Sequence, residues 1–157
     1  MPATTDIVAA ITGHHAELEA ALDARVDAVV RAARDGADPA AAVAELRGLL
    51  DHDIVPHARA EEDVLYAAAV TPDLRPLVTG MIFEHETLLG LATDLAGATA
   101  AVDSASVAAA IRAVFVGHVR RENELLLPAL AADPAVDLPA LLPVMQQRFA
   151  DYRAVAS

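Results

Sequence analysis

The 157-residue chain contains no cysteine, no tryptophan and no lysine, and aromatic residues make up only 3% of it. Without cysteine there is no disulfide framework, no thiolate-ligated zinc, no iron–sulfur cluster and no thiol catalysis. Uncharged runs such as Leu125–Ala132 fall far short of the ~18 apolar residues that a membrane-spanning helix requires. The N-terminal residues lack the basic and apolar segments of a signal peptide. These absences predict a soluble, cytoplasmic protein without a membrane partner.

Acidic residues dominate the charge of the chain. Twenty-three Asp and Glu residues face 11 basic residues, which gives a net charge of −12. Such a surface repels DNA, RNA and anionic membranes, so no nucleic-acid partner is expected. Alanine fills about a quarter of the chain by direct count, and alanine has the highest helix propensity of all residues. The composition therefore predicts an all-α protein.

Proline, glycine and aspartate divide the chain into helical segments. We expect long helices over about 5–34, 39–70, 77–96 and 104–132, and a shorter one over 138–153, with a kink at Pro56. Four long helices with short connections bury their apolar stripes most simply as an up-down-up-down four-helix bundle. Residues 1–135 would form this bundle, and residues 136–157 a C-terminal helical extension on or beside it.

Each of the four apolar stripes is interrupted by one histidine, and in the second and fourth helices a glutamate follows one turn later. These interrupting residues are His15, His57, Glu61, His85, His118 and Glu122. Positions i and i+4 share one face of a helix, so each His-x-x-x-Glu pair presents a nitrogen and an oxygen ligand together. About 0.3 such pairs are expected by chance on this composition. Three occur, because Glu19 also follows His15 by four residues.

The two helical hairpins resemble diverged copies of each other, since the segments that begin at His57 and His118 share His, Arg, Glu and Leu at matching places. Their packing would bring four imidazoles and two carboxylates to one level of the core. Burying these groups without partners costs several kcal/mol per charge, which two cations would offset. A single tetrahedral zinc ion takes about four ligands, so six ligands favour two metal ions over one. Imidazole and carboxylate suit iron, manganese and zinc, so the ligand types alone do not decide the metal.

The string His57-Ala-Arg-Ala-Glu-Glu-Asp-Val-Leu-Tyr and the string His118-Val-Arg-Arg-Glu-Asn-Glu-Leu-Leu-Leu-Pro resemble the two His-x-x-x-Glu signatures of the hemerythrin-like (HHE) cation-binding domains. Glu84-His85 and His14-His15 are similar to the single-histidine helices of that family. The resemblance covers about residues 5–132. It implies a non-haem di-iron centre, two iron ions joined by an oxo or hydroxo bridge, with Glu61 and Glu122 bridging or flanking the irons.

The resemblance also implies that the protein binds or reacts with O₂, peroxide or NO, in O₂ or redox sensing, binding or detoxification. Oxygen-carrying hemerythrins place a second histidine one turn away on the third helix, whereas the neighbours of His85 are Met81 and Leu89. Six protein ligands in place of seven favour sensing or turnover over simple O₂ carriage. The alternative is a di-iron oxygenase or a peroxidase- or catalase-like enzyme, and the sequence does not decide whether the protein is an enzyme.

Several neighbours of the six residues compete for the site. His14 lies about 100° around the helix from His15, so His15 is the preferred ligand. Glu19 and Glu62 are assigned to hydrogen bonds or ion pairs, and His52 to the surface. Tyr66, nine residues after His57, is expected on the opposite face of its helix.

The apolar neighbours of the six residues are assigned to the core. Met81, Phe83 and Phe115 are expected to pack there or to line a small apolar pocket beside the metals, and Leu125 to continue the inward stripe of the fourth helix.

Overall fold

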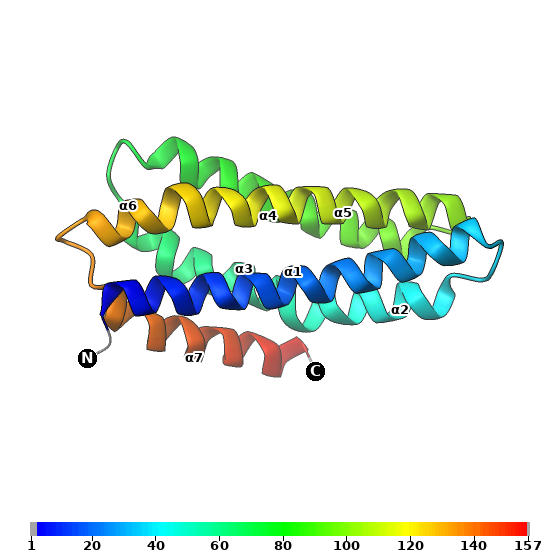
Figure 1. The fold of residues 1–157 in the computed structure, drawn as a ribbon, viewed down its shortest axis with the longest axis horizontal. Coiled ribbons are helices and arrows are strands. Elements are labelled where there is room, and N and C mark those ends of the chain that lie inside the picture. The colour runs from blue at the N-terminus through cyan, green and yellow to red at the C-terminus, as the bar shows by residue number, and fades with distance from the viewer. Residues whose placement is uncertain (1–2, 157) are drawn as a thin grey trace.

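The computed structural model describes residues 3–156, which form four long helices and one shorter helix, with no strand in that range (Figure 1). The elements, in chain order, are α1 (Thr4–Arg34), α2 (Ala40–Leu49), η1 (Leu50–Ile54), α3 (Val55–Glu61), η2 (Glu62–Tyr66), α4 (Arg75–Gly97), α5 (Ala101–Arg121), η3 (Glu122–Leu126), α6 (Leu127–Ala132) and α7 (Leu138–Ala156). The second long helix runs from α2 to η2 and the fourth from α5 to α6. Successive long helices run in opposite directions, so the predicted all-α, up-down-up-down bundle is confirmed.

Short polar signals begin and end the helices. The Asp6 carboxylate accepts a hydrogen bond from the Ala3 N–H and closes the start of α1. Gly36 adopts a positive φ of 68°, which glycine tolerates without strain, and α1 ends just before it. The Asp38 carboxylate accepts from the Ala40 N–H and begins the second long helix, as the Asp-Pro sequence predicts.

Three π-helical turns, η1, η2 and η3, widen the second and fourth long helices. Two of them lie directly before Pro56 and Pro128. Proline has no N–H and its ring crowds the carbonyl four residues earlier, and a wider turn relieves that contact. The carbonyl of His52, four residues before Pro56, accepts its hydrogen bond from Nε of Arg153 instead, at 3.0 Å. Each π-helical turn also rotates every later side chain of its helix relative to an unbroken α-helix.

The apolar core consists of two clusters that occupy opposite ends of the bundle. One cluster centres on Leu22, Leu46 and Ile111, and the other on Leu65, Leu127 and other residues of α1, α4, α6 and α7. The buried histidines and glutamates belong to neither cluster. The bundle therefore encloses a polar layer with apolar packing on both sides.

The C-terminal helix α7 lies along the outside of the bundle beside α1 and α3 (Figure 1). Leu138 and Met145 bury their side chains against the bundle. The Tyr152 hydroxyl donates to Asp63 at 2.6 Å, and Arg153 pairs with Asp53 at 3.1 Å. The C-terminal end of α7 is therefore held against the second long helix.

The segment Ala101–Ala132 is long and apolar enough to cross a membrane when judged by length and composition alone. Core helices pass the same test. This segment packs against α1 and α4 and carries the buried His118 and Glu122, so it is a core helix of the bundle.

Candidate metal centre

All six residues predicted as ligands lie in the polar layer between the two apolar clusters. None of them is more than 5% exposed, and His15 and Glu122 are fully buried. Each long helix contributes one histidine, and the second and fourth also contribute a glutamate. The layer therefore holds six potential ligands with almost no access to water.

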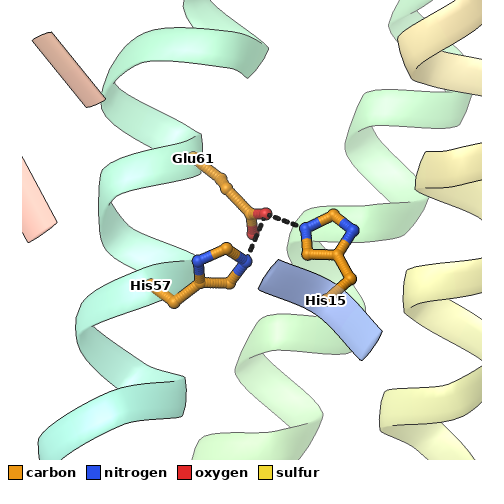
Figure 2. Close-up of side chains that lie close together, drawn as sticks. All are labelled: His15, His57 and Glu61. Atoms are coloured by element: carbon orange, nitrogen blue, oxygen red, sulfur yellow. Dashed lines mark hydrogen bonds and ion pairs between the residues drawn. The ribbon is translucent and has the colours of Figure 1, made fainter. Parts of the chain in front are cut away.

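The first group of ligand atoms surrounds Oε1 of Glu61. Nε2 of His57 lies 2.6 Å from this oxygen, and Nε2 of His15 lies 3.1 Å from it (Figure 2). His57 and Glu61 are one helical turn apart, as their spacing predicts, while His15 approaches from α1. These three side chains form one candidate cation site.

The second group shares Glu61 with the first. The two Nε2 atoms of His85 and His118 are 3.0 Å apart, and Oε2 of Glu61 lies 3.7 Å from His85. Oε2 of Glu122 lies 3.5 Å from Nε2 of His15 and 3.8 Å from Nε2 of His118. Each carboxylate thus contacts histidines of both groups, which is the placement of a bridging ligand.

Several buried atoms in this layer have no hydrogen-bond partner among residues 3–156. They include Oε2 of Glu61, both carboxylate oxygens of Glu122, and Nε2 of His57, which is close to Glu61 but not aligned for a hydrogen bond. Two ligand atoms that bind the same ion at about 2.1 Å, with an angle of about 90° at the ion, are about 3 Å apart. The separations of 2.6 to 3.8 Å match this value. The residues therefore fit bound metal ions, and these ions would satisfy the unpartnered atoms.

Three of the four histidines are oriented by a hydrogen bond from the other ring nitrogen. Nδ1–H of His15 donates to Oδ1 of Asn123 at 2.7 Å, His85 pairs with Glu62 at 2.6 Å, and His118 pairs with Glu84 at 3.1 Å. A proton on Nδ1 leaves Nε2 with its lone pair facing inward. Metal-binding histidines are held by the same kind of outer partner. The assignment of Glu62 to a hydrogen bond is confirmed.

Asn123 and Glu84 each contact the outer ring nitrogen of a predicted ligand, a role that the sequence did not indicate. Each is the immediate neighbour of a predicted ligand, Glu122 or His85. Arg121 in turn forms an ion pair with Glu84, so a surface arginine reaches His118 through one carboxylate. The sequence shows only that Asn123 and Glu84 each lie next to a predicted ligand. That position does not show which histidine the side chain contacts.

Tyr66 lies inside the site, and the prediction that it faces away is wrong. Its side chain is buried, its ring stacks on His85 with centroids 5.6 Å apart, and its hydroxyl lies 3.3 Å from Nε2 of His118. The π-helical turn η2 causes the difference, because Tyr66 is its last residue. The site therefore contains a buried hydroxyl beside the second group.

The competing polar residues lie outside the layer. The side chain of His14 is 36% exposed, with its ring edge-on to His57. His52 is exposed, as predicted, and Glu19 is half-buried with no hydrogen bond or ion pair within residues 3–156. The geometry brings His15 and not His14 to the centre, while the assignment of the six ligands stays a prediction.

Two predicted core positions are wrong. Phe83 is 59% exposed, and Leu125 is 53% exposed because η3 turns Leu126 inward in its place. Met81 and Phe115 are buried as predicted.

Electrostatics within the layer oppose simultaneous ionisation of its two glutamates. Burial would raise the pKa of Glu61, but the charges and hydrogen bonds of His57 and His15 hold it well below the ordinary value. Burial and the neighbouring Glu61 charge raise the pKa of Glu122 far above its ordinary value. Burial lowers the pKa of His118 to about 3. In the metal-free protein these effects favour the protonated form of Glu122 and the neutral form of His118, and cations would take the place of that proton.

Replacing Asn123 with Leu is expected to weaken metal binding about 10- to 100-fold, the usual cost of removing the outer partner of a ligating histidine. Leu keeps the volume but cannot accept the proton of His15 Nδ1, so the ring loses its fixed orientation. Competition with a chromogenic chelator measures the affinity. Glu124→Gln is the matched control, because Glu124 pairs only with the exposed Arg120. Equal affinities of the two variants would remove Asn123 from the site.

Comparison with known proteins agrees with this geometry. The family model described as Hemerythrin HHE cation binding domain matches residues 6–130, which include all six predicted ligands together with Tyr66 and Asn123. The search of curated proteins and the search of solved structures found no match. A match over most of the chain, with the family's cation-binding residue types gathered in one buried layer, shows that the chain belongs to the hemerythrin HHE cation-binding domain family.

Proposed function

We propose that the chain holds two iron ions in the His/Glu layer and binds or reacts with O₂, peroxide or NO there, in sensing, binding or detoxification. One observation carries the proposal: four imidazole Nε2 atoms and two carboxylates converge in an apolar interior, and several of them have no other partner. Imidazole-rich ligation is well suited to iron. Bound iron would supply reversible electron transfer to these small ligands.

The side chains of the layer have distinct tasks in this proposal. His15 and His57 would hold one ion, and His85 and His118 the other. Glu61 contacts histidines of both groups with its two oxygens, so it could contribute a ligand oxygen to each ion. The apolar clusters above and below keep bulk water out of the layer, which favours small uncharged ligands such as O₂ and NO.

An alternative proposal is an enzyme that turns over peroxide or a small organic substrate. The position of Tyr66 favours it, because the hydroxyl lies 3.3 Å from Nε2 of His118 and is buried. Burial and the charge of Glu61 raise the pKa of Tyr66, so the hydroxyl keeps its proton. A protonated hydroxyl at this place is within reach to donate to a ligand that is being reduced.

Metal quantitation combined with an ultraviolet–visible spectrum tests the proposal. Aerobically purified protein should contain about two irons per chain, with near-ultraviolet absorption that dithionite bleaches and air restores. His57→Ala and His118→Ala should lose the iron, whereas the matched surface variant His52→Ala should keep it. Stoichiometric zinc without iron, from iron-replete cells, would contradict the proposal.

Functional assays then separate binding from catalysis. A band that forms with O₂ and disappears on deoxygenation supports reversible binding. Consumption of many equivalents of peroxide, with loss of rate in Tyr66→Phe, supports the enzyme. The cytoplasmic location expected from the sequence stays a prediction.

A further inference from the structure

A pocket of about 260 Å³ lies between α1, α3 and α7 and borders the metal layer at His57. Its walls are mainly apolar and come from three helices that are distant in sequence. The lining residues are Ala10, Ile11, His14, His57, Ala60, Leu142, Met145, Gln146 and Phe149. Ala10 and Gln146 are exposed and form the rim, while Ile11, His57 and Ala60 are buried and form the floor.

The pocket exists because small and large residues face each other across it. The bundle presents Ala10 from α1 and Ala60 from α3, and α7 closes the space with Met145 and Phe149. Met145 is buried even though it belongs to the outermost helix, so α7 is seated firmly at this place. A larger residue at Ala10 or Ala60 would fill the space and leave α7 packed against the bundle.

Three rings line one side of the pocket. The ring centroids of His14 and Phe149 are 5.6 Å apart, those of His14 and His57 are 5.0 Å apart, and those of His57 and Phe149 are 6.2 Å apart. All three pairs meet edge to face. Edges and faces of such rings pack favourably against another ring, with a preferred centroid separation of about 4.5–7 Å.

We propose that this pocket binds a small neutral organic molecule with one six-membered ring and one hydrogen-bonding group. An apolar cavity of about 150 Å³ is known to hold benzene, so 260 Å³ accommodates a ring with a short substituent. The ring of His14 and the amide of Gln146 are polar groups that can hydrogen-bond to that substituent.

The charge of the lining selects against ionised ligands. Among residues 3–156 no Asp, Glu, Lys or Arg lines the pocket, so an ionised ligand would lose hydration there without gaining a counter-ion from the lining. The net charge of −12 further disfavours anions. This inference goes beyond the proposed redox function, because the pocket is complete without any metal ion.

Titration calorimetry with benzyl alcohol as the probe tests the proposal. Metal-loaded protein should show saturable binding with one site per chain and a dissociation constant on the order of 1 mM or lower. Benzoate, the ionised analogue of similar size, should show at least about tenfold weaker binding. The measurement is repeated on chelator-treated protein, in which a benzoate signal cannot come from iron. The chelator-treated protein should still bind benzyl alcohol. Failure of the pocket proposal can therefore be distinguished from failure of the iron proposal.

A pair of matched variants assigns the binding to the pocket. Ala10→Phe places a ring in the mouth of the pocket and should abolish binding, whereas Ala9→Phe adds the same ring at a neighbouring exposed position outside it. Both substitutions are on the surface of α1, so both variants should fold, which circular dichroism verifies. Absent binding in the parent protein, or equal binding by the two variants, would overturn the proposal.

Discussion

Glu61→Gln is expected to reduce metal affinity by more than the roughly 10- to 100-fold that loss of an outer histidine partner costs. The amide keeps the shape of the side chain but removes the negative charge. Both oxygens of Glu61 face histidine Nε2 atoms, at 3.1 Å from His15 and 3.7 Å from His85, so one substitution affects both groups at once. Metal content after dialysis, together with competition against a chelator of known affinity, measures the effect.

Glu19→Gln is the control that matches this variant most closely. Glu19 follows His15 by four residues, as Glu61 follows His57, yet it is half-buried outside the layer. Its replacement should leave both metal content and affinity unchanged. Parent-like metal binding by Glu61→Gln would show that the carboxylate does not bridge, and a loss in Glu19→Gln would extend the site along α1.

The sequence was sufficient to predict that these four histidines and two glutamates are buried in one layer, because the signal is local. A histidine in an apolar stripe has only one direction in which to point once the stripe is buried. The choice of His15 over His14 needed nothing more than helical periodicity, and the burial of His15 agrees with it. The same rule placed His85 and His118 correctly, since no π-helical turn precedes either residue within its helix.

Tyr66 shows where helical periodicity fails. On an unbroken α-helix, the ninth residue after His57 points about 180° away from it. One extra residue in η2 reduces that angle to about 80°, and the hydroxyl reaches the centre. Leu125 is misplaced by η3 in the same way. Pro128 indicates η3 in the sequence, whereas no proline follows η2 closely. The η2 turn therefore depends on packing that the sequence alone does not reveal.

The outer hydrogen bonds could not be predicted, because they join different helices. Asn123 on the fourth long helix contacts His15 on the first, and Glu84 on the third contacts His118 on the fourth. These pairs depend on helix rotation and on the axial offset between helices, which periodicity does not give. Phe83 has a related explanation, since its position next to Glu84 turns it outward when Glu84 turns toward His118.

Removal of the metal is expected to lower the melting temperature by about 8–16 °C. One ion present at 1,000 times its dissociation constant stabilises the folded state by about 4.1 kcal/mol. Each kcal/mol shifts the melting temperature of a protein of this size by about 2–4 °C. The unpartnered oxygens of Glu122 and Glu61 are the structural reason, because without a cation they stay buried without partners. Scanning calorimetry of loaded and chelator-treated protein measures the shift.

The same scan on Glu61→Gln separates metal binding from other effects of the chelator. If the stabilisation comes from ions in the layer, chelation should lower the melting temperature of this variant by much less than it lowers that of the parent. The metal-free variant should be less stable than the metal-free parent, because the amide cannot replace the buried carboxylate that pairs with His57 and His15 and whose pKa they lower. An equal chelator-induced shift in both proteins would place the stabilising ion outside the layer of histidines and glutamates.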